Sequence, residues 1–275
     1  MRKMSGEAAA SGHRFEIAVD CAAPELLAQA EELAARLGLP LAENGARHQL
    51  LLRCTAEGLE LLKPDDPQLR GPLRVDFTAG AMDFRRKQPG KELLLRAVGC
   101  KTGRPLAVLD ATGGLGRDSF LLAAAGCTVH VFEREPVQAA LLADGLERAR
   151  QCPDTAAIAA RIRLTAGDVL PFLHEMRTQG QVVDAIYFDP MFPERRKSAL
   201  VKKEAQLLQL LAQPASPAAE KELLAAARAV SHRVAVKRPA KATFLGEAAP
   251  SHSLVGATVR FDVYLSSSGQ PSTSQ

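Results

Sequence analysis

From Pro105 onward, the chain alternates short apolar runs with stretches whose apolar residues recur at helical spacing. Six runs read as β-strands because each is short, apolar and bounded by turn residues: 105–110, 127–133, 161–168, 184–189, 233–239 and 257–265. Helical patterns lie between them: 118–126, 136–150, 198–213 and 221–230. Strands that alternate with helices predict βαβ units, and therefore an α/β fold with a mainly parallel sheet.

The first part of the chain has a different pattern. An amphipathic helical stretch comes first, and two apolar runs that predict strands follow it: 24–37, 48–54 and 58–63. Three prolines and a glycine then interrupt the pattern at 63–72. We therefore expect two domains between flexible polar tails: tail 1–12, a small N-terminal α+β domain 13–104, a larger domain 105–265 and tail 266–275.

Composition narrows the class of protein. The 275 residues are 47% hydrophobic and 24% charged, with a formal net charge of +4. These values are typical of a soluble globular protein and exclude a disordered chain, a collagen-like repeat and a coiled-coil rod. The five cysteines form no CxxC pair and the six histidines show no ligand spacing, so we expect no metal. The N-terminus has no apolar signal core, so we expect a cytoplasmic protein without a membrane partner.

A glycine-rich loop follows the first strand of the larger domain. In parallel sheets, ligands bind at the carboxyl ends of the strands, and glycines there let the backbone approach a ligand closely. The dinucleotide motif GxGxxG does not fit this loop, whereas the order acid-x-x-x-Gly-x-Gly fits S-adenosylmethionine enzymes; its members are Asp110, Gly114 and Gly116. Arg117 and Asp118 are placed to bind the amino-acid end of this cofactor. Read alone, the glycines could also form a plain turn.

Two further acids stand at the ends of the next strands. Glu133 ends the second strand, where a carboxylate can accept hydrogen bonds from both ribose hydroxyls. The alternative is that Glu133 caps the helix that begins at Pro136. Asp168 ends the third strand and could accept from the adenine amine. An N-cap of the helix that begins at Val169 is nearly as good an explanation of Asp168.

The fourth strand ends in an acid-proline-x-aromatic turn. To methylate an amine on a nucleic-acid base, an enzyme must hold the NH₂ by its protons and aim the nitrogen at the methyl donor. The Asp189 carboxylate and the Pro190 carbonyl can be the two acceptors, and Phe192 can stack on the base. We therefore predict Asp189, Pro190 and Phe192 as catalytic residues. The structural alternative is a proline-stiffened turn with a buried phenylalanine.

Basic residues gather near the strand ends. Singly, each is more often a solvated charge than a binding site, but three clusters fit a phosphate-rich substrate better. We predict that ten residues bind RNA: Arg85, Arg86, Lys87, Arg195, Arg196, Lys197, Lys202, Lys203, Lys237 and Arg238.

Several stretches together resemble the bacterial ribosomal RNA small subunit methyltransferase J family: DATGGLGRDSFLLAAAGCTVHVFERE, FDPMFPERRKSALVKKE, VAVKRP, VRFDVY and VDFTAGAMDFRRK. The resemblance implies a class I, Rossmann-like methyltransferase fold with a seven-stranded sheet. It also implies methyl transfer from S-adenosylmethionine to the N2 amine of guanine 1516 in 16S rRNA, on the small ribosomal subunit or its precursor. The implied cofactor contacts are Arg117, Asp118, Glu133, Arg134, Gly167, Asp168 and Asp189.

This chain departs from the family at two places. Gly113 stands where the family has alanine, and the segment after Lys87 is shorter than usual. Three other functions remain open: methylation of another nucleic-acid or protein amine, RNA-binding assembly without catalysis, and NAD-dependent oxidation. The glycine spacing disfavours the last.

Overall fold

The structure is a computed structural model that describes most of the chain. The described residues are 16–43, 48–66, 69, 71–79, 93–101, 104–190, 203–211 and 215–266. They form two compact units, and the chain passes from the first to the second between Val75 and Asp76. Helix α8 (Lys203–Leu211) belongs to the first unit although it lies late in the sequence.

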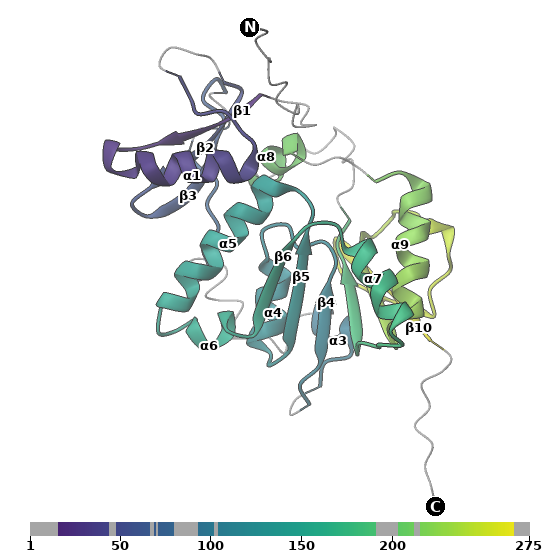
Figure 1. Ribbon diagram of the computed structural model, residues 1–275. Coiled ribbons are helices and arrows are strands. Elements are labelled where there is room, and N and C mark those ends of the chain that lie inside the picture. Colours follow the sequence, from purple (N-terminus) through teal and green to yellow (C-terminus); the bar gives the residue numbers. More distant parts are fainter. Residues whose placement is uncertain are drawn as a thin grey trace, which may run out of the picture. The chain divides into compact units, whose positions relative to one another are not determined.

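The first unit contains a three-stranded sheet in the order β1-β2-β3. Its elements are β1 (Ile17–Cys21), η1 (Pro24–Leu26), α1 (Leu27–Leu37), β2 (Leu50–Thr55) and β3 (Gly58–Leu62). Strand β1 is parallel to β2, and β2 and β3 form an antiparallel hairpin. Every second residue of β2 is buried, as expected of a strand with one face on a core. Both predicted strands and the predicted helix are present (Figure 1).

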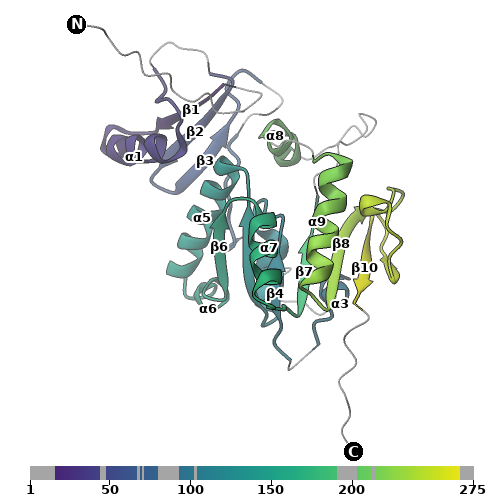
Figure 2. The ribbon, with the colours of Figure 1, turned by 45° about the vertical axis from the view of Figure 1, so that its right-hand side comes forward.

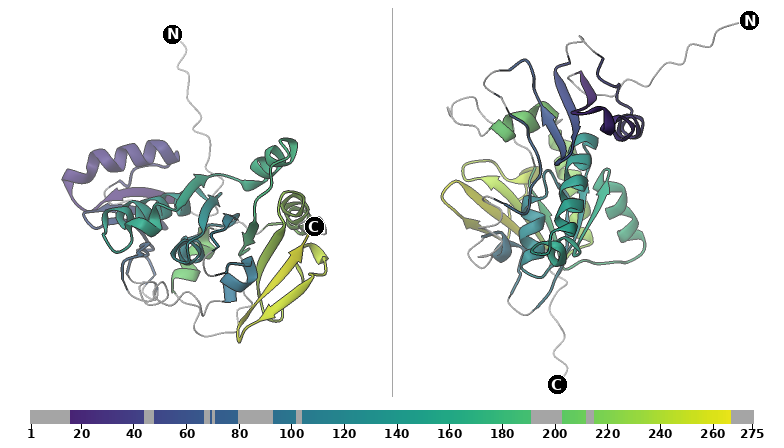
Figure 3. Two further views of the ribbon diagram at one scale, coloured as in Figure 1. Left: turned by 90° about the horizontal axis from the view of Figure 1, so that it is seen from below. Right: turned by 90° about the vertical axis from the view of Figure 1, so that its left-hand side faces the viewer.

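The second unit is built on a seven-stranded sheet in the order β6-β5-β4-β7-β8-β10-β9. Its strands are β4 (Ala107–Asp110), β5 (Thr128–Glu133), β6 (Ile162–Ala166), β7 (Ala185–Phe188), β8 (Arg233–Pro239), β9 (His252–Val255) and β10 (Val259–Leu265). The five strands from β6 to β8 are mutually parallel, and β10 is antiparallel to both of its neighbours. The yellow strands form one edge of the sheet in both views of Figure 3. The predicted α/β class and the mainly parallel sheet are therefore confirmed.

Helices cover both faces of this sheet. They are α3 (Leu93–Val98), α4 (Arg117–Ala124), α5 (Pro136–Gln151), α6 (Ala156–Ala159), α7 (Val169–Thr178), α9 (Pro217–Ala229) and the short η4 (Leu245–Glu247). Figure 2 shows α7 and α9 in front of the sheet and α3 behind it. Leu173 of α7 and Leu224 of α9 pack on Ile186 and Val236 of the central strands. No helix among the described residues is both long and apolar enough to cross a bilayer.

Two details differ from the sequence expectations. Helix α3 packs on β8 and β10, so residues 76–104 group with the larger unit rather than with the small domain expected over 13–104. Strand β9 was not among the six predicted runs. It is a short edge strand without a buried residue, and apolar patterning therefore carries little signal there.

Candidate active site at the carboxyl ends of the strands

The loop after β4 is held together by a buried acid. Asp110 is 1% exposed and accepts hydrogen bonds from the Thr112 backbone N–H, at 3.1 Å, and from the Ser119 hydroxyl. Burial raises the pKa of Asp110 to about 7, although these two hydrogen bonds act in the opposite direction. Because Thr112 lies in the loop and Ser119 in α4, Asp110 ties the loop to the helix that follows it.

Two glycines give this loop its path. Gly114 and Gly116 have φ angles of 53° and 71°, in the left-handed region that favours glycine. A Cβ on Gly116 would collide with the Leu142 side chain. At Gly114, by contrast, the nearest atom to an added Cβ is the Thr112 carbonyl oxygen at 4.0 Å. Gly116 therefore permits close packing against α5, and Gly114 leaves open space beside the backbone.

Glu133, at the end of β5, faces the same loop. Its side chain accepts from the Gly114 N–H at 2.6 Å and, through its other oxygen, from the Glu135 N–H at 2.8 Å. Glu133 is 7% exposed, and burial raises its pKa against the opposing effect of these two donors. Helix α5 is capped by Glu135, which accepts from the Gln138 N–H at 2.6 Å. The idea that Glu133 caps this helix is therefore wrong.

Asp168 follows β6 and does cap a helix. Its Oδ1 accepts from the Leu170 N–H at 2.8 Å, at the first turn of α7. Just before it, the Gly167 N–H donates to the carbonyl oxygen of Glu133 at 2.8 Å. The N-cap explanation of Asp168 is confirmed. The side chain is exposed and has a second oxygen, so the proposed adenine contact stays a prediction.

An ion cluster joins α4, β7 and β8. Lys237 Nζ lies 2.8 Å from Asp118 Oδ2 and 2.7 Å from Asp189 Oδ2. The Tyr187 hydroxyl also donates to Asp118 Oδ2, at 2.6 Å. The Asp189 backbone N–H donates to the Thr112 hydroxyl at 2.6 Å. The turn after β7 is thus fixed to the glycine-rich loop by its backbone and to β8 by its side chain.

The cluster keeps its donors protonated. Burial alone would lower the pKa of Lys237, but the carboxylates of Asp118 and Asp189 outweigh it, so the net shift is upward. Burial and the neighbouring Asp118 carboxylate raise the pKa of Tyr187 well above its usual range. At neutral pH, Lys237 is therefore a cation, and Tyr187 is a neutral hydrogen-bond donor.

Comparison with known proteins identifies the family. A family model described as "Putative SAM-dependent methyltransferase" matches residues 32–266. Two curated relatives are named ribosomal RNA small subunit methyltransferase J and are each 46% identical to this chain. The one from Pseudomonas paraeruginosa aligns over 89% of this chain and 96% of its own, and the one from Thioalkalivibrio sulfidiphilus over 90% and 97%. The chain belongs to the ribosomal RNA small subunit methyltransferase J family.

A solved structure agrees with this assignment. The crystal structure of a SAM-dependent methyltransferase from Neisseria gonorrhoeae is 31% identical, has a TM-score of 0.71, and covers 94% of this chain and 99% of its own. The protein is therefore an S-adenosylmethionine-dependent methyltransferase with the class I fold that the sequence predicted.

The residues at the strand ends fit this cofactor. Each oxygen of Glu133 accepts one backbone N–H and retains a lone pair, so the carboxylate can still accept from ribose hydroxyls. The open space beside Gly114 lets a ligand approach the loop. Arg117 and Arg134 are exposed at this edge of the sheet, on α4 and just after β5. Among the described residues there is no group of three or more metal-ligating side chains.

One RNA-binding prediction is wrong, and a second needs a new explanation. Arg238 is 2% exposed, and its Nε and Nη2 donate to the Thr243 carbonyl oxygen at 3.1 and 2.8 Å, so it holds a turn rather than a phosphate. Lys237 is paired with two acids instead of facing solvent alone. Sequence reasoning missed Thr112, Ser119 and Tyr187. Their signal was their position beside the motif acids.

Most of the other basic residues predicted to bind RNA lie outside the described residues. These are Arg85, Arg86, Lys87, Arg195, Arg196, Lys197 and Lys202, and the predicted stacking residue Phe192 lies outside as well. Lys203 begins α8, but its side chain is not described. Pro190 is described and directly follows Asp189.

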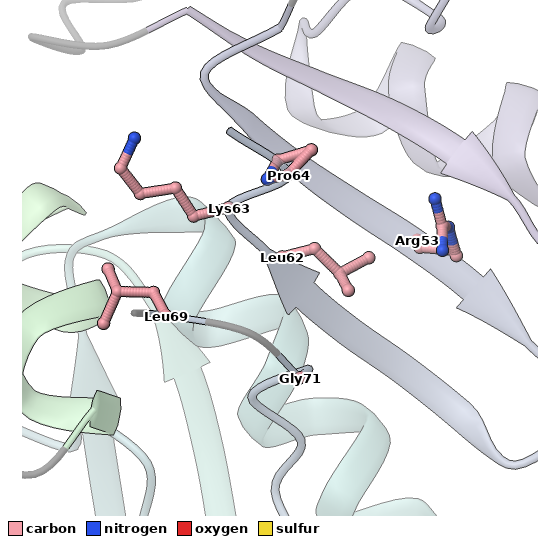
Figure 4. Close-up of a pocket in the computed structure, with 6 residues that line it drawn as sticks. All are labelled: Arg53, Leu62, Lys63, Pro64, Leu69 and Gly71. Atoms are coloured by element: carbon pink, nitrogen blue, oxygen red, sulfur yellow. The ribbon is translucent and has the colours of Figure 1, made fainter. Parts of the chain in front are cut away.

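The first unit contains a hollow of its own. It has a volume of about 240 Å³ and is lined by Arg53, Leu62, Lys63, Pro64, Leu69 and Gly71 (Figure 4). Arg53 is partly engaged elsewhere, since its Nε donates to Asp20 at 2.7 Å. The hollow thus combines an apolar wall with two cationic side chains, which lie on opposite sides of Leu62 in the view of Figure 4.

Proposed function

We propose that this methyltransferase methylates the exocyclic N2 amine of a guanine in 16S rRNA, which the family resemblance places at guanine 1516. The names of the curated relatives support ribosomal RNA of the small subunit as the substrate class. The chemistry of the turn after β7 supports an amine as the acceptor group. We place the reaction in the cytoplasm, on 16S rRNA or on the small subunit that contains it.

One observation carries this proposal. The Asp189 backbone N–H is bonded to the Thr112 hydroxyl, so the acceptors of the turn are fixed relative to the loop that faces the cofactor. Methyl transfer needs the amine nitrogen in line with the methyl donor, and such positioning supplies a large share of the rate acceleration. A rigid link between the two binding elements meets that requirement.

The chain's own residues then have distinct roles. When bound, S-adenosylmethionine supplies a methyl group on a positively charged sulfur. The Asp189 carboxylate and the Pro190 carbonyl accept the two amine protons and so orient the nitrogen lone pair. The proton that leaves the nitrogen after transfer passes to Asp189. Phe192 stacks on the guanine plane and limits its rotation.

The cofactor contacts follow the sequence prediction. Glu133 binds the ribose hydroxyls, and Asp168 with Gly167 lies at the adenine. Arg117, Asp118 and Arg134 lie around the rest of the cofactor, with Asp110 and the two glycines shaping the loop. The basic residues outside the described part of the chain, with Lys203, contact RNA phosphates and set the register of the strand.

Methyl transfer to RNA tests the proposal directly. The protein is incubated with tritium-labelled S-adenosylmethionine and small subunits from a strain that lacks the family's enzyme, and the digested rRNA is mapped by mass. We expect one methylated guanine. Asp189→Ala should reduce transfer by about 100-fold while cofactor affinity, measured by calorimetry, stays within a few-fold.

Asp184 provides a matched control. It precedes the same strand, at the opposite end of β7, where its side chain accepts from the Ala107 N–H at 2.8 Å. Asp184→Ala should lower stability without changing turnover per folded molecule. Equal turnover of Asp189→Ala and the parent would contradict the catalytic assignment. Label in protein or small amines instead of rRNA would favour another acceptor, and binding without turnover would favour an assembly factor.

A further inference from the structure

We propose that Lys237 is a positioning residue whose ammonium clamps one oxygen of Asp189, leaving the other oxygen aimed at the amine of the target base. This inference rests on the proposed function, because it concerns the same acceptor. It assigns Lys237 a role that differs from contact with an RNA phosphate.

The geometry of the clamp is specific. The ammonium contacts Asp189 through Oδ2, at 2.7 Å, and no hydrogen bond to Oδ1 is present within the part of the chain that the structure describes. The Asp189 backbone is held separately by Thr112. Both ends of the residue are therefore fixed, and Oδ1 keeps its lone pairs for an incoming donor. The side chain of Asp189 is 41% exposed, so such a donor can reach it.

Lys237 is poorly placed to bind a phosphate. Its side chain is 25% exposed, and two of its three N–H donors are directed at Asp118 and Asp189. Releasing it to a phosphate would leave two carboxylates close together without their shared cation, and this is costly in a partly buried site. The ion pairs therefore favour a role inside the site.

The surrounding charges explain why a clamp is needed. The titratable groups that face Asp189 come from four elements: Asp110 at the end of β4, Asp118 on α4, Tyr187 on β7 and Lys237 on β8. Tyr187 is neutral, so the other two acids repel the charge on Asp189, and Lys237 attracts it. Without Lys237, Asp189 would bind a proton more readily and lose its ability to accept from the amine.

The experiment compares three variants in the full-length protein with small-subunit RNA. Lys237→Met removes the charge and retains the length of the side chain, and Lys237→Arg retains the charge. Lys241→Met makes the same change at an exposed lysine after β8 and serves as the control. Transfer rates are measured from pH 5 to pH 9 at saturating cofactor and RNA, and cofactor affinity is measured by calorimetry.

We expect Lys237→Met to lower kcat at pH 7 by at least about tenfold and to move the acidic limb of the rate profile up by about one pH unit or more. Lys237→Arg should restore the limb, and Lys241→Met should match the parent. Cofactor affinity should not weaken in Lys237→Met, because the cofactor has a net positive charge and the lost group is a cation. An unshifted limb, or a kcat equal to that of the parent, would overturn the proposal.

A second variant covers the case in which Lys237→Met does not fold. Asp118→Asn preserves an acceptor for Lys237 and Tyr187 but removes one negative charge, so the acidic limb should move to lower pH. No movement would contradict the clamp. If the parent protein itself transfers no methyl group to rRNA, the proposed function fails, and this result is distinct from a parent that is active and variants that do not shift.

Discussion

Replacing Glu133 by glutamine tests the cofactor site most directly. The two carboxylate oxygens face two backbone donors, the Gly114 N–H at 2.6 Å and the Glu135 N–H at 2.8 Å. A glutamine amide has one acceptor oxygen and one NH₂ group, so one of these N–H groups would face another donor. The ribose hydroxyls would also lose an ionised acceptor.

The magnitude follows from the charge of the acceptor. A hydrogen bond to a charged group contributes about 1.5–3 kcal/mol, and an amide replaces only part of it. We expect cofactor affinity to fall by roughly 10- to 150-fold, since about 1.4 kcal/mol corresponds to a factor of ten. Calorimetric titration with S-adenosylmethionine and with its demethylated product measures this loss.

Glu135 offers a closely matched control. It lies two residues further on, is 8% exposed where Glu133 is 7%, and caps α5 instead of facing the loop. Burial raises the pKa of Glu135 to about 7, so its neutral form is already accessible, and Glu135→Gln should fold normally. We expect it to bind cofactor like the parent. Unchanged affinity in Glu133→Gln, or equal losses in both variants, would refute the ribose assignment.

Two further predictions concern stability and RNA binding. Because burial raises the pKa of Asp110 from 3.8 to about 7, the folded state retains a proton that the unfolded chain has lost. Between those values, stability should fall as pH rises, by up to about 1.4 kcal/mol per pH unit; in denaturant titrations Asp110→Asn should remove this slope, and an identical slope would contradict the assignment. Reversing Arg195 and Arg196 to glutamate should weaken RNA binding and flatten its log–log salt dependence by roughly 0.7 per lost phosphate contact, with unchanged cofactor affinity; RNA affinity insensitive to salt and to reversal would exclude these contacts.

Local patterns were enough to predict the framework of the larger unit. Apolar runs that end in an acid predicted strands whose carboxyl ends carry Asp110, Glu133 and Asp189, and the structure has β4, β5 and β7 ending at these positions or one residue before them. The reason is that strand ends and helix starts are set by residues near in sequence. The capping of α5 was harder to predict, because Glu133 and Glu135 both precede the helix and only their side-chain directions distinguish them.

Charge partners across strands could not be predicted in the same way. Lys237 and Arg238 are neighbours in sequence and were both interpreted as phosphate contacts. Successive side chains of a strand point to opposite faces of the sheet. One of the pair therefore meets the acids of α4 and β7, and the other turns to the Thr243 carbonyl. Which face carries the acids depends on contacts between residues far apart in the chain, for which sequence clustering provides no signal.

The acids at this edge also connect cofactor binding with proton binding. Asp110, Asp118 and Asp189 raise one another's proton affinity, and Lys237 offsets part of this repulsion. A ligand with a net positive charge that enters beside them has the same electrostatic effect as a second lysine, so it favours their ionised forms. By linkage, the ionised acids in turn favour that ligand. Binding of the methyl donor therefore helps to prepare the Asp189 carboxylate as an acceptor, before the target base arrives.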